Sequence, residues 1–242
     1  MTETAASPEA AVAHTAFFDE LDHVVAEGWA RIHNGPYYRH VREHGAGREL
    51  YRRTMCQLWH YIQHNPLNQA VAVLGMPPRR THLIRYAVDH SLEELGHEKM
   101  IEHDLRLVGL LDEPLSASTP LPATQAFIGW LYYVSLRQGA VARMGYSYWA
   151  ERSYDQIGEL LDRLRNDLGM TDRSMSFFVA HSTIDTKHAD DVRRALERNA
   201  DTPEIQRQVI EVARTSLYLN AALLDNVLDD YLASLAAKSV KI

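Results

Sequence analysis

Two short segments of the chain carry residue types that bind metal ions, at spacings that suit an α-helix. Glu94 and His97 are three residues apart in the first segment, and the second contains His181, Asp185 and His188. At about 100° per residue, each set falls on one face of its helix. Two imidazoles and a carboxylate are the ligands typical of a non-haem iron site. The second segment therefore predicts an iron site, and the first could complete a two-metal centre.

Glu151 is a third candidate ligand. It ends an almost uninterrupted apolar and aromatic stretch, residues 144–150, where a carboxylate is unexpected. A two-metal site needs a carboxylate that can bridge the ions. We therefore interpret Glu151 as the bridging ligand, and the alternative is that neighbouring side chains such as Arg152 satisfy its charge.

Each candidate set also has an interpretation without a metal. The first pair lies in a strongly charged segment, where it could be a solvated surface pair. The second set follows the apolar residues 177–180, and burying its three polar side chains without partners would cost folding free energy. This cost favours metal ligation for the second set. Asp190 and Asp191 could take the place of Asp185 as its carboxylate.

Four other side chains could contact a small-molecule substrate. His60 and His64 share a helix face beside Tyr61, and either histidine could instead be a metal ligand. Tyr148 belongs to an aromatic stretch that is more typical of a packed core, although such side chains also line apolar pockets. The residues that we predict for the substrate pocket are therefore His60, Tyr61, His64 and Tyr148.

Composition excludes several classes of protein. The net charge is -7 and no basic cluster stands out, which argues against nucleic-acid binding. The only cysteine, Cys56, excludes an intrachain disulfide and a cysteine-rich metal site. No apolar run approaches 18 residues, so no membrane-spanning helix is expected. The N-terminus lacks the features of a signal peptide, and we expect a cytoplasmic protein.

Helical periodicity runs through nearly the whole chain, and no segment alternates as a β-strand does. We expect a disordered lead over residues 1–11 and a single all-α domain over residues 12–242, built from seven or eight helices. Glycine and proline positions delimit these helices. The expected ranges are 12–33, 36–43, 48–75 with a kink at 65–66, 77–109, 123–154, 155–169, 170–199 and 203–237.

The order and separation of Glu94-x-x-His97, Glu151 and His181-x-x-x-Asp185-x-x-His188 resemble the heme-oxygenase-like di-iron oxidase and oxygenase superfamily. That fold is shared with TenA-type thiaminases and PqqC-type oxidases. The resemblance covers roughly residues 12–236 and implies a heme-oxygenase-like bundle. It also implies that these six residues hold two Fe(II) ions and that dioxygen is the co-substrate.

The implied reaction is oxidation of a small organic substrate, amino-acid-like or fatty-acid-like, in specialised metabolism. We expect the protein to be a homodimer with no membrane or nucleic-acid partner. Four alternatives stay open: a mononuclear iron oxygenase, a cofactor-free PqqC-like oxidase, a metal-dependent hydrolase and a non-catalytic helical module. A TenA-type thiaminase is disfavoured, because it needs a nucleophilic cysteine in mid-chain and Cys56 lies in an early helix.

The chain departs from this superfamily at one ligand. Many members supply a further glutamate from the helix before the ExxH segment, where this chain has His60, Gln63 and His64 and no carboxylate. His90 or Glu93 could contribute instead. Because anionic ligands supply much of the affinity for a hard cation, we expect one of the two ions to be weakly bound.

Overall fold

The computed structural model describes the backbone of residues 8–239 and the side chains of residues 15–181 and 187–239. All regular secondary structure in this part of the chain is helical, which confirms the all-α prediction. The α-helices are α1 (Pro8–His33), α2 (Pro36–His44), α3 (Arg48–Ile62), α4 (Asn65–Val71), α5 (Thr81–Glu93), α6 (Glu98–Leu107), α7 (Pro122–Arg137), α8 (Gly139–Ala150), α9 (Gly158–Leu168), α10 (Ser176–Asn199) and α11 (Pro203–Ser239). Short 3₁₀ segments are η1 (Leu115–Ala117), η2 (Ser153–Gln156) and η3 (Asp172–Ser174). None of the described helices has the length and apolar character needed to cross a membrane.

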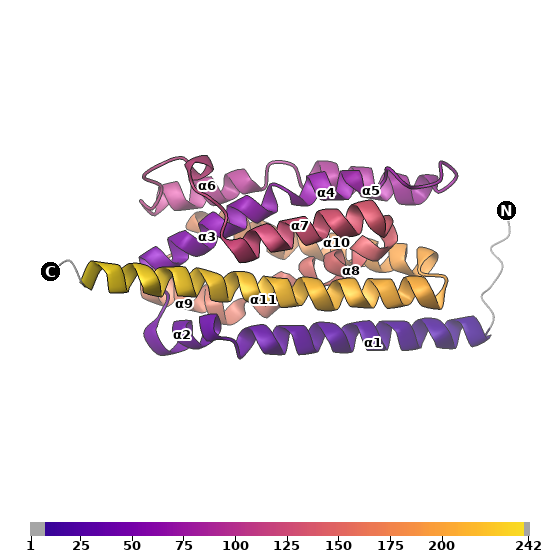
Figure 1. Ribbon diagram of the computed structural model, residues 1–242, viewed down its shortest axis with the longest axis horizontal. Helices are drawn as coiled ribbons and strands as arrows, with labels where there is room; N and C mark the ends of the chain where they lie inside the picture. Colours follow the sequence, from indigo (N-terminus) through magenta and orange to yellow (C-terminus); the bar gives the residue numbers. More distant parts are fainter. Residues whose placement is uncertain (1–7, 240–242) are drawn as a thin grey trace.

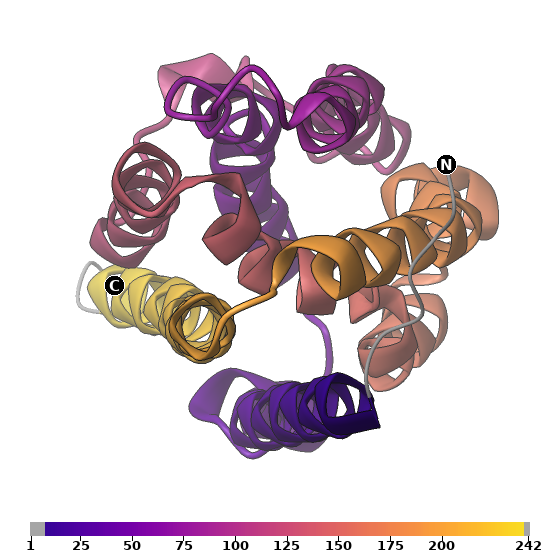
Figure 2. The ribbon, with the colours of Figure 1, turned by 90° about the vertical axis from the view of Figure 1, so that its right-hand side faces the viewer.

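The two longest helices form one side of the bundle. α1 and α11 lie side by side along the molecule and run in the same direction (Figure 1). Seen along the long axis, the helices are arranged around a common centre (Figure 2). Helix α8 packs against α7, α10 and α11, and most of its residues are buried. A side chain at the end of α8 is thereby delivered to the middle of the bundle.

A glycine sets the distance between α8 and α11. A Cβ atom on Gly145 would lie 2.1 Å from the carbonyl oxygen of Val209 and 3.0 Å from the backbone nitrogen of Ala213. Only a residue without a side chain therefore allows the two backbones to approach this closely. This contact fixes the last turns of α8 against the longest helix of the protein.

The structure divides the helices more finely than we expected. The predicted helix over residues 77–109 is two helices, α5 and α6, separated by a turn in which Gly96 has φ +94°. The predicted helix over residues 123–154 breaks before α8, where Gly139 has φ +85°. Left-handed backbone of this kind ends an α-helix and favours glycine. The segment 48–75 is likewise divided, into α3 and α4, just before the predicted kink at 65–66.

We expect Gly145→Ala to destabilise the fold. The added methyl group would overlap the backbone of α11, and overpacking of this kind lowers the free energy of unfolding by about 3 kcal/mol. Gly129→Ala is the matched control, because Gly129 is an exposed residue within α7 with no atom within 4 Å of an added Cβ. Its greater helix propensity should raise the free energy by up to about 1 kcal/mol. Urea unfolding of both variants tests this, and equal midpoints would contradict the packing argument.

Candidate metal centre

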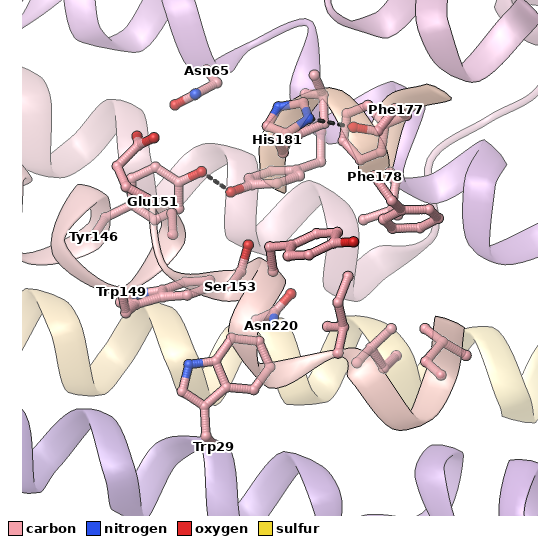
Figure 3. Close-up of a pocket in the computed structure, with 18 of the residues that line it drawn as sticks. Trp29, Asn65, Tyr146, Trp149, Glu151, Ser153, Phe177, Phe178, His181 and Asn220 are labelled. Carbon is pink, nitrogen blue, oxygen red and sulfur yellow. Dashed lines mark hydrogen bonds between the residues drawn. The ribbon is translucent and has the colours of Figure 1, made fainter. Parts of the chain in front are cut away.

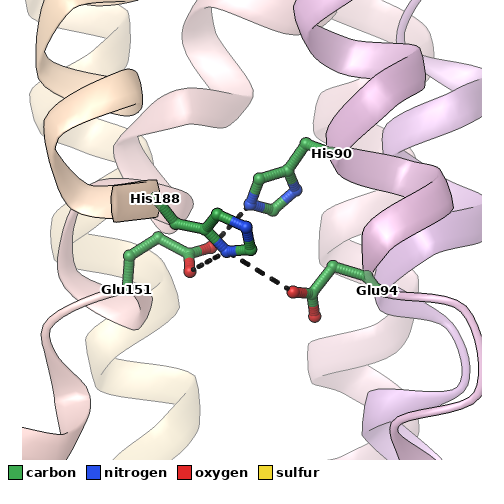
Figure 4. A group of neighbouring side chains, drawn as sticks. All are labelled: His90, Glu94, Glu151 and His188. Atoms are coloured by element: carbon green, nitrogen blue, oxygen red, sulfur yellow. Dashed lines mark hydrogen bonds and ion pairs between the residues drawn. The ribbon is translucent and has the colours of Figure 1, made fainter. Parts of the chain in front are cut away.

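Four buried side chains meet in the middle of the bundle (Figure 4). His90 lies in the last turn of α5, Glu94 follows that helix, Glu151 follows α8, and His188 comes from α10. Each offers one ligand atom, and these four atoms lie within 4.8 Å of one another. His90 Nε2 donates to Glu151 Oε1 at 3.1 Å, and His188 Nδ1 donates to Glu151 Oε2 at 3.3 Å. We refer to these four residues as the first group.

A second group adjoins the first and shares Glu94 with it. Its members are Glu94, His97 and His181, whose ligand atoms again lie within 4.8 Å of one another. His97 Nδ1 is 3.4 Å from Glu94 Oε2. His181 Nδ1 donates to the carbonyl oxygen of Phe177 at 2.5 Å, which leaves its Nε2 as the available ligand atom. The arrangement suits two neighbouring cations with one carboxylate between them.

Five of the six ligands predicted from the sequence belong to these groups, and the sixth, Asp185, lies outside the described side chains. The grouping differs from the prediction that His181 and His188 serve the same ion. Seven residues of α-helix advance by about 10.5 Å, so these two imidazoles reach different groups. His90, a possible replacement for the missing upstream glutamate, belongs to the first group.

The helix ends add to the negative potential of the site. Glu94 is the residue that caps the C-terminus of α5, and Glu151 caps that of α8. A helix C-terminus carries a partial negative charge of about half an electron, and this favours cations nearby. Two carboxylates and two helix C-termini therefore both contribute negative potential at the site, which favours a bound cation.

In the metal-free protein, imidazoles compensate this charge. Burial raises the pKa of Glu151, but hydrogen bonds and charges from His188 and His90 outweigh it and lower the pKa to about 2. Burial lowers the pKa of His188, whereas Glu151, Glu93 and Glu94 raise it, with a net pKa of about 9. Without a metal, Glu151 and His188 are thus an ion pair. A metal ion that binds His188 Nδ1 must displace its proton.

Glu93 fixes the orientation of His188. His188 Nε2 donates to Glu93 Oε2 at 2.8 Å, and Lys187 Nζ donates to the other oxygen of Glu93 at 3.2 Å. The ring is therefore held with Nδ1 toward the first group. Metal-binding histidines usually donate their second nitrogen to a carboxylate or carbonyl in this way. Glu93, the other possible replacement for the missing glutamate, lies on the far side of the His188 ring from the first group.

A buried arginine sets the orientation of a side chain next to Glu94. Arg143 donates to Asn65 Oδ1, Asn68 Oδ1 and Gln69 Oε1, each at 2.6 Å. Because a guanidinium has only donors, the oxygen of Asn65 must face Arg143. The amide nitrogen of Asn65 then donates to Glu94 Oε2 at 3.2 Å. The carboxylate shared by both groups is thereby held in place by a hydrogen bond from an uncharged donor.

The donor atoms suit iron. Both groups present imidazole nitrogens and carboxylate oxygens and no thiolate, a set that binds redox-active iron. His90 Nδ1 is buried and has no hydrogen-bond partner among the described residues. Such an orphaned atom in a native core calls for an unseen partner such as an ion or a water molecule.

A cavity of about 140 Å³ opens beside the two groups (Figure 3). Glu94, Glu151 and His181 form part of its wall. Aromatic side chains supply much of the remainder, and they include Trp29, Tyr61, Tyr146, Trp149, Phe177 and Phe178. A small molecule in this cavity would touch the candidate ligands directly.

Only Tyr61 of the four predicted pocket residues lines this cavity. His60 Nε2 instead hydrogen-bonds with Ser118 Oγ at 2.8 Å, and His64 Nδ1 pairs with the hydroxyl of Tyr132 at 3.1 Å.

The fourth predicted residue, Tyr148, donates its hydroxyl to Asp22 Oδ1 at 2.6 Å. Because His60 and His64 bond to Ser118 and Tyr132 and do not line the cavity, the helix face that they share is turned away from the site. Trp29 was not predicted, because nothing in the sequence shows that α1 reaches the cavity.

Comparisons with known proteins agree with the site. A family model described as an iron-containing redox enzyme matches residues 52–221, a range that includes every candidate ligand. The 4-aminobenzoate synthase of Nitrosomonas europaea is 25% identical over 158 residues. That match covers 64% of this chain and 64% of the synthase, so the chain spans less than two thirds of the length of this relative.

Solved structures show the same fold. A domain of unknown function with a heme oxygenase-like fold from Shewanella denitrificans is 37% identical, with a TM-score of 0.83 over 89% of this chain and 93% of that one. A TenA homologue from Pyrococcus furiosus is 13% identical, with a TM-score of 0.69 over 87% of this chain and 99% of that one. The predicted heme-oxygenase-like fold is confirmed.

The stability that His188 contributes to the metal-free protein should be lost at alkaline pH. Its folded-state pKa of about 9 lies above the value of about 6.5 for an unfolded chain, so the folded state binds this proton more tightly. The contribution is therefore complete below about pH 6.5 and disappears as the pH rises through about 9. Urea unfolding of the metal-free protein between pH 6 and 10 measures the decline. His188→Gln should reduce this decline in the free energy of unfolding. An unchanged decline in that variant would show that another titratable residue causes it.

Proposed function

We propose that this chain, which belongs to the iron-containing redox enzyme family, is an iron-dependent oxidoreductase that holds two ferrous ions and uses dioxygen to oxidise a small organic molecule. The observation that carries this proposal is the pair of adjoining ligand groups with Glu94 in common. A shared carboxylate suits a two-metal centre, since it can bind both ions at once.

The first group would hold one ion through His90, Glu94, Glu151 and His188. It has two carboxylates and two imidazoles, and Glu93 already orients one of the imidazoles. These features favour tight binding of a divalent cation.

The second group would hold the other ion more weakly. Its described ligands are Glu94, His97 and His181, with a single carboxylate that the first ion also uses. We propose that Asp185 completes this group, as the superfamily motif implies. Fewer anionic ligands mean less neutralisation of the ion's charge, and therefore a lower affinity.

The side chains around the centre have defined tasks in this reaction. The chemistry that ferrous ions would supply, when bound by these residues, is the donation of electrons to dioxygen. Glu94 and Glu151 offset the positive charge, and His188 gives up the proton on Nδ1 when it becomes a ligand. The aromatic walls of the cavity hold the organic molecule beside the ligands and keep bulk water away from it.

An anaerobic titration with ferrous iron should saturate near two ions per chain. His188→Ala should remove the ion of the first group, His181→Ala that of the second, and Glu94→Ala should weaken both. His103→Ala is the control, because His103 is exposed and belongs to neither group. Elemental analysis and equilibrium dialysis count the ions, and oxygen uptake should fall in each ligand variant. Saturation at one ion, lost in His188→Ala and kept in His181→Ala, would leave a mononuclear iron oxygenase.

Replacing Glu93 tests the orientation of His188. Glu93→Gln should lower the affinity of the first group for ferrous iron by about tenfold or more, because the ring loses its charged acceptor. The matched control is Asp89→Asn, which changes an exposed carboxylate of the same helix that is paired with Arg85 instead. If both variants bind iron equally well, Glu93 has no such part.

A further inference from the structure

We propose that the cavity binds an uncharged molecule of about the size of one ring, whose hydrogen-bonding group lies against Asn220 and Ser153. This names the class of substrate for the proposed oxidation and rests on that function. Phenols, anilines and aromatic carboxamides belong to this class. Amino-acid zwitterions and long fatty acids do not.

The size of the cavity supports a single ring. A volume of about 140 Å³ is close to that of an engineered apolar protein cavity that binds benzene, which is about 150 Å³. Trp149, Phe177 and Phe178 offer flat apolar surfaces to such a ring. A long acyl chain would exceed this space and would have to extend out of the cavity into solvent.

In the iron-free protein, the charges of the side chains around the cavity disfavour a carboxylate. Glu94, Glu151 and His181 line it, and all three belong to the ligand groups. No lysine or arginine lines it among the described residues. Arg143 is buried nearby in the bundle, but its guanidinium donates its hydrogen bonds to side-chain oxygens of α4. In the iron-free protein, an acidic ligand would therefore be buried beside two carboxylates with no cationic side chain to pair with it, which is unfavourable.

Two neutral polar side chains mark where a polar group would bind. Asn220 of α11 and Ser153 of η2 both line the cavity. Figure 3 shows them beside Trp29 and Trp149, whereas Asn65 lies on the other side. Asn65 is engaged with Glu94 and Arg143, but no side-chain hydrogen bond joins Asn220 or Ser153 to another described residue.

These two free groups set the chemistry of the ligand. An amide and a hydroxyl each donate and accept hydrogen bonds, so together they suit a hydroxyl, amine or carboxamide group. A ligand anchored there would turn its apolar body toward Glu151 and His181, where the oxidation is proposed to occur.

Calorimetric titration of the protein under nitrogen tests the proposal, with iron-loaded and iron-free protein side by side. The probes are 4-methylphenol, 4-methylbenzoate, toluene and dodecanoate. We expect 4-methylphenol to bind one per chain in both forms, and in the iron-free form to bind at least tenfold more tightly than 4-methylbenzoate. Dodecanoate should not displace it. Equal affinity of the iron-free form for the acid, or displacement by dodecanoate, would overturn the proposal.

Variants locate the polar contact. Asn220→Leu should lower the affinity for 4-methylphenol by about three- to tenfold, which corresponds to the loss of one hydrogen bond, and should leave toluene binding unchanged. Asn166→Leu, an exposed change on α9, should alter neither. Undiminished 4-methylphenol binding in Asn220→Leu would overturn the placement. Because the iron-free arm needs neither metal nor dioxygen, its failure would refute the cavity assignment and leave the iron proposal standing.

Discussion

Glu94 and Glu151 are buried in the same cluster, and a carboxylate in such surroundings costs several kcal/mol of folding free energy unless it is paired. The chain meets this constraint with imidazoles from two directions: His90 comes from α5 and His188 from α10. The paired arrangement requires α5, α8 and α10 to meet in the core. A bound cation would offset the negative charge of the two carboxylates more completely than the imidazoles do. The arrangement that stabilises the metal-free fold is therefore also one that can bind a metal ion.

Helix α8 bears three of the constraints that make this meeting possible. Arg143 joins it to α4 through hydrogen bonds to Asn68 and Gln69. Gly145 allows close contact with α11, and Glu151 at its end enters the ligand cluster. Two of these residues lie in one short helix and the third caps it, so a displacement of α8 would disturb the arginine network, the helix packing and the centre together.

The sequence was sufficient to predict the helical class, the superfamily and most of the residue types at the centre, because these depend on periodicity and ligand chemistry. It was less informative about how the ligands divide between two groups. The spacing of His181 and His188 shows that they share a face of α10. It does not show which neighbours they contact, because the two residues are separated along the helix axis and reach different groups. The break at Gly96 was hidden within a strongly helical pattern, since an isolated glycine also occurs inside helices. The cavity wall could not be predicted, because Trp29 and Asn220 reach it only through tertiary packing.

The first group begins at His90 and ends at His188, and this separation has a consequence for synthesis of the protein on the ribosome. A nascent chain in which α5 and α8 have emerged but α10 has not holds both carboxylates with only one of the two imidazoles that pair with Glu151. Closing so long a loop is slow compared with forming the local helices. Co-translational assembly of the first group must therefore wait until α10 has been made, so the metal centre can form only late in synthesis.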